Sequence, residues 1–312
     1  MVLTSSQSIN LKLSSPHSIP NHLKVLLNKI RLEHYEELYE PEADGTTPLQ
    51  NTLNKVLNSL RSSNQRLNHL RYLWMTLILT LVVEPTLEYY QPSNSLPKYI
   101  IDLITLWLRI TTRNTLNNSK IKITELRVYE LIKEISEKRD LSSDRKLASF
   151  QTTDEALDVF KNAVRVIDYE QALEAIIEIL DDCLEGYAIF PGSYGRRELF
   201  DWWLLDVVPA SWYLLPPKSF YVVESLQNQE NIKSRQTNLL GKASFEIWDS
   251  LLGESNSKEE ANSHILYCDE RYTSTKINKV RLDRKVRLDN LKLKLSISNS
   301  SKNTQSEPVY FM

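Results

Sequence analysis

Residues 186–224 constrain the fold of this chain most strongly, because large apolar side chains and backbone-breaking residues are concentrated there. The stretch holds three of the six tryptophans, three of the six glycines and four of the twelve prolines. Tryptophan buries a large area, so such a stretch needs other elements to cover it. We expect residues 186–224 to form an aromatic hub, against which an otherwise helical protein packs.

Glycine is scarce in the rest of the chain, which argues against an all-β fold rich in tight turns. The sequence predicts a mainly α fold of two helical lobes, at residues 21–140 and 141–298, with a short C-terminal β-hairpin. A polar, Ser-rich arm is expected at residues 1–20. A disordered tail is expected at residues 299–312.

Apolar residues spaced at the helical period predict the individual helices. A long pattern begins at Leu49, and we expect Pro85 to end it. Its most apolar part, Tyr72–Val83, is shorter than a membrane-spanning helix and predicts a buried core helix. A helical hairpin is expected over residues 153–184, and a helix inside the hub is expected to stop at Pro209.

The predicted β-hairpin lies at residues 279–298, where apolar and polar residues alternate around a turn at Asp289–Asn290. Its outer face would carry the basic side chains of Lys279, Arg281, Lys285, Arg287, Lys292 and Lys294. Such a face suits an acidic partner such as nucleic acid, lipid or protein. The alternative is a solvated edge kept basic to prevent aggregation.

A second candidate site stands at the start of the hub helix. Backbone amides and two basic side chains there could hold a phosphate or carboxylate, and the residues are Ser193, Gly195, Arg196 and Arg197. The alternative is a glycine turn whose arginines pair with acids such as Glu198 or Asp201.

The pair Gly192–Ser193 resembles the Gly-Ser turn that opens nucleotidyltransferases of the polymerase-β type. In that family an Asp-x-Asp pair on a strand holds the catalytic metals. Here Asp201 and Asp206 are five residues apart in a helical pattern, so they lie on different faces and cannot share a metal. The resemblance covers about fifteen residues and departs from the family at its metal ligands.

Three tryptophans of the hub are candidate partner-binding residues: Trp202, Trp203 and Trp212. Consecutive residues point about 100° apart on a helix, so we expect one of Trp202 and Trp203 to leave the core and meet the other lobe or a partner. The alternative is that these tryptophans only fill the core.

Composition favours an unprocessed cytoplasmic protein, with organelle import as the alternative. The net charge of −2 gives no overall attraction to polyanions, and two cysteines do not make a disulfide framework. His264 and Cys268 form a single pair of potential ligands, so no metal site or cofactor is expected.

The sequence thus predicts a non-enzymatic interaction or assembly protein, a scaffold or adaptor that presents the hub to a protein partner. The alternative is a nucleic-acid-associated regulator that uses the basic hairpin and the Arg196–Arg197 turn. A nucleotidyltransferase-like enzyme is a third hypothesis, although no catalytic residues are identified.

Overall fold

The computed structural model describes residues 19–35, 38, 47–113, 130, 132–135, 137, 147–184, 188–189, 195–222 and 228–254. All regular structure in these residues is helical, which confirms the mainly α prediction. The described helices are α1 (Asn21–Leu32), α2 (Leu49–Ser59), α3 (Gln65–Tyr90), α4 (Leu96–Arg113), α6 (Leu147–Arg165), α7 (Tyr169–Leu184), α8 (Arg196–Trp202), the π-helical segment η2 (Trp203–Val207), α9 (Val208–Tyr213) and α10 (Gln229–Glu254). The predicted β-hairpin at 279–298 lies outside the described residues.

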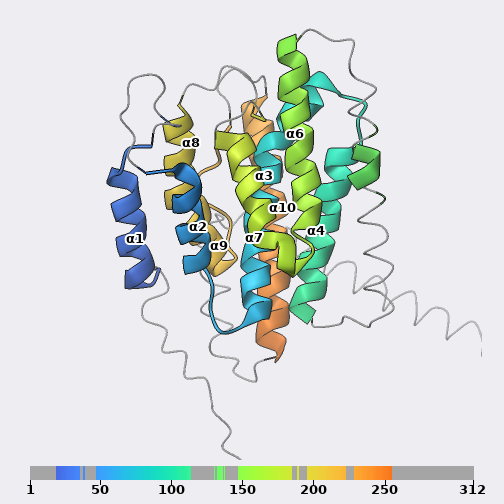
Figure 1. The fold of residues 1–312 in the computed structure, drawn as a ribbon. Helices are drawn as coiled ribbons and strands as arrows, with labels where there is room; N and C mark the ends of the chain where they lie inside the picture. Colours follow the sequence, from blue (N-terminus) through green and yellow to red (C-terminus); the bar gives the residue numbers. More distant parts are fainter. Residues whose placement is uncertain are drawn as a thin grey trace, which may run out of the picture. The chain divides into compact units, whose positions relative to one another are not determined.

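Helix α3 is the central helix, and α4, α6, α7 and α9 pack against it (Figure 1). The side chain of Asn64 caps its N-terminus by accepting a hydrogen bond from the amide of Leu67 at 3.1 Å. Eighteen of the 26 residues of α3 are buried, because its sequence is apolar on every side after Arg71.

By length and composition α3 could also cross a membrane, and no other described helix could. In the structure, however, 94% of its apolar 18-residue window is buried inside the protein. Every residue of Tyr72–Val83 is buried, so the prediction of a core helix over this run is confirmed.

The prediction that Pro85 ends this helix is wrong, because α3 continues to Tyr90. Proline has no amide hydrogen, so the carbonyl of Leu81, four residues earlier, loses its helical partner. The side-chain amide of Gln236, from α10, donates to that carbonyl and replaces the missing hydrogen bond. A partner that is distant in sequence therefore lets the helix pass through the proline.

The predicted helical hairpin is confirmed by α6 and α7, which pack along each other and on α3 (Figure 1). The turn between them follows Arg165, and the carboxylate of Asp168 accepts a hydrogen bond from the amide of Glu170 at 3.0 Å. This bond caps the N-terminus of α7 and fixes where the second helix begins.

The chain divides into two compact units, residues 1–251 and residues 252–312. Within the first unit, buried apolar residues of the described helices form one hydrophobic core. Of the second unit only the end of α10, residues 252–254, is described. The predicted division into lobes at residues 21–140 and 141–298 stays a prediction.

Candidate functional site

The described part of the aromatic hub contains one helical rod, in which α8, η2 and α9 follow each other without a break. The prediction that this helix stops at Pro209 is wrong, because it continues to Tyr213. The amide of Val208 bonds to the carbonyl of Trp203, five residues earlier, which makes the turn before the proline π-helical. Pro209 then occupies the first turn of α9, where a missing amide hydrogen is tolerated.

Trp202 and Trp203 are both buried, at 8% and 0% exposure. Trp203 packs against Phe200, with ring centroids 5.7 Å apart. Trp202 packs against Tyr221 at 5.9 Å, and its indole N–H donates to the carbonyl of Ser219 at 2.9 Å. The chain that follows α9 therefore covers the second face of the rod. This burial corrects the expectation that one tryptophan leaves the core, while a partner contact by either stays a prediction.

Trp212 is half-buried and belongs to a clamp around Arg71, whose guanidinium carbon lies 3.6 Å from the Trp212 ring centroid. Arg71 is 5% exposed and donates to the carbonyl of Leu60 at 2.7 Å and to that of Trp212 at 3.2 Å. These carbonyls stand at the C-terminal ends of α2 and α9, where helix dipoles are negative.

The charge of Arg71 is thus balanced by two helix ends in place of a carboxylate. Burial lowers the pKa of Arg71 to about 10, so its guanidinium stays charged at neutral pH. The clamp joins α3 to the ends of α2 and α9, and it gives Trp212 a structural role.

In the predicted anion site at the start of α8, Arg197 is bound by groups of the protein itself. Arg197 donates to the carbonyls of Arg31 and Glu33 at the end of α1, the latter at 3.0 Å, and lies 3.3 Å from the carboxylate of Asp201. The alternative of an arginine paired with an acid is therefore confirmed for Arg197. Of the other predicted members, Ser193 lies outside the described residues, while Gly195 adopts a φ of 103° and begins the helix.

The two aspartates that follow the Gly-Ser turn have separate partners. Asp201 lies 3.7 Å from Arg31 and 3.3 Å from Arg197, whereas Asp206 accepts a hydrogen bond from the hydroxyl of Ser219. Within the part of the chain that the structure describes, no three His, Cys, Asp or Glu side chains are placed to hold a metal ion. The arrangement gives the resemblance to nucleotidyltransferases no support at its metal ligands.

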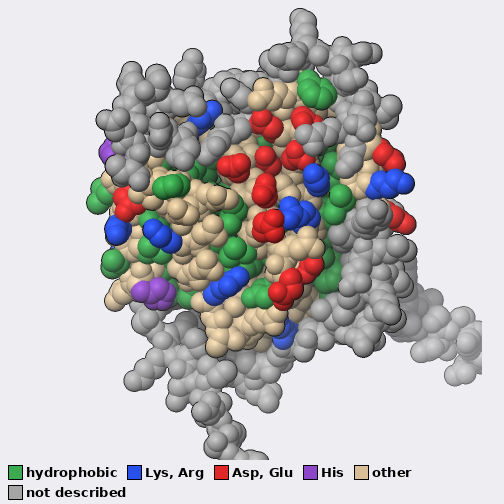
Figure 2. All heavy atoms as spheres, in the orientation of Figure 1, with side chains coloured by type: hydrophobic (Ala, Val, Ile, Leu, Met, Phe, Trp, Pro, Cys, Tyr) green, Lys and Arg blue, Asp and Glu red, His purple; other side chains and the backbone are tan. Residues whose placement is uncertain are grey.

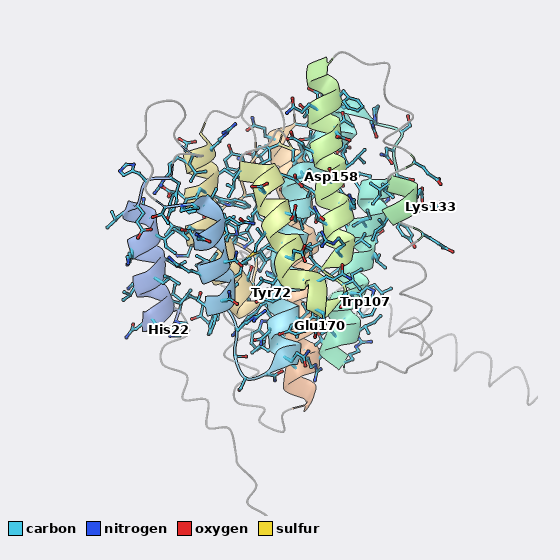
Figure 3. All side chains as sticks on the ribbon, in the orientation of Figure 1. His22, Tyr72, Trp107, Lys133, Asp158 and Glu170 are labelled. Atoms are coloured by element: carbon cyan, nitrogen blue, oxygen red, sulfur yellow. The ribbon has the colours of Figure 1, made fainter. Side chains whose placement is uncertain are left out.

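Carboxylates gather on the surface of α6 and α7, in the centre of Figure 2, and Figure 3 labels Asp158 on α6. Asp182 and the four carboxylates that raise its pKa define what we call the acidic face: Glu155 and Asp158 on α6, and Glu178, Asp181 and Asp182 on α7. Burial, followed by repulsion from the other four carboxylates, raises the pKa of Asp182 to about 8. Its buried Oδ2 atom has no hydrogen-bond donor among the described residues.

Lys161 of α6 pairs with the acidic face and lies 3.3 Å from Asp158. This cation does not bring the pKa of Asp182 back to its ordinary value. A group of carboxylates on neighbouring helices suits a positively charged partner.

Reasoning from sequence missed the acidic face, although the signal was present. The predicted hairpin over residues 153–184 turns near Asp168, so residues at similar distances from that turn lie side by side. Asp158 and Glu178 are such a pair, and the remaining acids of the face stand within one turn of them. Reading the charges of both helices together would have located the face.

Comparison of the chain with protein-family models, with curated proteins and with solved structures finds no match. The site is therefore interpreted from its own residues.

Proposed function

We propose that this chain is a non-enzymatic interaction protein, a scaffold or adaptor that binds a basic protein segment on the acidic face. The tryptophans of the hub then serve as the core that holds the helices in place. The surface that meets the partner is supplied by α6 and α7, which rest on α3.

The observation that supports this proposal most directly is the perturbed carboxylate Asp182. Burial is the largest cause of the raised pKa of Asp182, and repulsion from four neighbouring carboxylates adds to it, which indicates that acidic groups lie close together here. Lysine or arginine side chains of a partner would gain Coulomb energy from the carboxylates that surround Asp182. Charge complementarity of this kind also speeds association.

A direct test uses a fluorescently labelled ten-residue lysine peptide as the probe, with anisotropy measured in 50 mM and 300 mM NaCl. We expect binding that weakens with salt. The triple variant Glu155→Gln, Glu178→Gln, Asp181→Asn should weaken binding about tenfold, which corresponds to about 1.4 kcal/mol.

A matched control removes the same charge elsewhere: Asp102→Asn on α4 with Glu230→Gln and Asp249→Asn on α10, all exposed positions. This variant should bind the peptide about as well as the unmodified chain. Equal weakening by both triple variants would show attraction to the net charge alone, and absence of binding at 50 mM NaCl would also refute the proposal.

The alternative of a nucleic-acid-associated regulator stays a prediction, since its basic residues from Lys279 to Lys294 lie outside the described residues. Among the described residues, Arg197 is engaged by α1 and the acidic face would repel phosphate. A nucleotidyltransferase-like activity likewise stays a prediction without a described metal site.

A further inference from the structure

Helix α10 makes an interface of unusual composition with the rest of the first unit. Its fully buried side chains, among those described, are Gln236, Leu240, Ala243, Ser244 and Ile247. Two of these five are polar and one is alanine, so only two large aliphatic side chains are completely withdrawn from water. Leu239 and Leu251 are partly buried against the core, so the hydrophobic contribution to holding α10 in place is modest for a helix of 26 residues.

Hydrogen bonds also hold α10 in place. Side chains of α10 donate them to backbone carbonyls that have no partner within their own helices. Gln236 donates to the carbonyl that Pro85 frees in α3. Ser244 donates to Leu214 at 2.7 Å and Trp248 to Tyr213 at 3.1 Å, both at the C-terminal end of α9. Helix ends leave carbonyls unsatisfied, so these are natural acceptors for a neighbouring helix.

These acceptors also make separation inexpensive. If α10 moves away, water reaches the same carbonyls and the freed side chains, so no polar group is left buried without a partner. One ion pair at the interface behaves in the same way: Arg235, 46% exposed, lies 3.4 Å from Glu88, 58% exposed, so water and salt reach this pair. Its second partner, Glu84 at 2.9 Å, is 13% exposed.

We propose that α10 is a detachable helix, which leaves the surface formed by α3, α4 and α9 and returns to it as one unit while those helices stay folded. Its opening would expose the carbonyls of Leu81, Tyr213 and Leu214. Opening and closing of a unit with few buried apolar contacts is the behaviour expected of the least stable element of a fold. Opening and closing of α10 would regulate access to the surface of α3, α4 and α9 that it covers.

Hydrogen exchange of the full chain, followed by mass spectrometry under native conditions, tests the proposal. Amides of α10 should exchange together, and at least about tenfold faster than those of α3. Ser244→Ala removes one attachment and should speed exchange of α10 about fivefold, with no change in α3.

Ser234→Ala is the matched control, because Ser234 is an exposed residue of the same helix. Both substitutions change helix propensity equally, so only the bond to Leu214 distinguishes them. Equal exchange rates in α3 and α10, equal effects of the two variants, or acceleration of both helices by Ser244→Ala would each overturn the proposal.

Discussion

Helices α3 and α10 have the same length, 26 residues, but differ in what they bury. Eighteen residues of α3 are buried, whereas five described residues of α10 are. Both are regular helices, so secondary structure alone does not distinguish them. The comparison shows that the share of a helix that is withdrawn from water decides how firmly it belongs to the fold.

The two helices also depend on each other at one point. Pro85 interrupts the hydrogen bonds of α3, and Gln236 of α10 repairs the interruption. The strongly buried helix α3 therefore has a carbonyl without a helical partner, and the weakly buried helix α10 supplies its hydrogen-bond donor. Loss of α10 would leave α3 intact only if water took the place of Gln236 at the carbonyl of Leu81.

The largest expected effect is a difference in the free energy of unfolding between variants of two tryptophans, Trp74 and Trp248, that make similar hydrogen bonds. The indole N–H of Trp74, in α3, donates to Leu215 at 2.9 Å, and that of Trp248, in α10, donates to Tyr213 at 3.1 Å. Trp74 is 0% exposed, so Trp74→Ala should lower the free energy of unfolding by about 3–5 kcal/mol. Trp248 is only half-buried, and Trp248→Ala should lower it by about 1 kcal/mol.

Urea unfolding followed by circular dichroism measures both values. The signal at 222 nm reports the whole helical content, so the midpoint reflects global unfolding. Similar midpoints for the two variants would contradict the difference that burial predicts between α3 and α10.

Raising the pH should lower the free energy of unfolding through Asp182, which lies on α7, a helix that packs against α3. The pKa of Asp182 is raised from 3.8 to about 8 in the folded state, so the folded chain binds more protons than the unfolded chain in this range. The free energy of unfolding should therefore fall as pH rises from about 4 to about 8, by no more than about 1.4 kcal/mol per pH unit from this group. Above that range the loss is complete.

Asp182→Asn isolates this contribution, because asparagine keeps the shape and cannot ionise. Urea unfolding at pH 5, 7 and 9 should show a smaller loss for the variant than for the unmodified chain. The groups that repel Asp182 are Glu155 and Asp158 on α6 and Glu178 and Asp181 on α7. Parallel pH profiles for the two proteins would show that the pKa of Asp182 is not raised in the folded state.

Much of the fold could be predicted from sequence because the helical period of apolar residues is a local signal. It located the core helix at Tyr72–Val83 and the hairpin at 153–184, and both are confirmed. The two helix stops at Pro85 and Pro209 were wrong for different reasons. Gln236, distant in sequence, satisfies one interruption, and a π-helical turn accommodates the other.

The candidate site was harder to predict because it depends on which surfaces meet. Consecutive tryptophans pointed to one exposed ring, yet a returning segment with Tyr221 covers Trp202. The sequence suggested that Arg197 binds an anion, because it does not reveal that the carbonyls at the end of α1 accept hydrogen bonds from this side chain. The acidic face combines three acids of α7 with two of α6, so its full extent depends on how the two helices pack.

The smallest expected effect concerns salt. Ion pairs that are partly accessible to water join α10 to its neighbours: Arg235 with Glu84 at 2.9 Å and with Glu88 at 3.4 Å, and Arg109 with Glu246 at 2.5 Å. Raising NaCl from 50 to 500 mM should screen them and speed hydrogen exchange of α10 about twofold, a change of about 0.4 kcal/mol. Exchange of α3 should respond less, because these pairs reach only its C-terminal end, at Glu84 and Glu88, and most of the helix is buried. Since Arg235→Gln removes two of the pairs, this variant should lose part of the salt response, and an unchanged response would assign it to other charges.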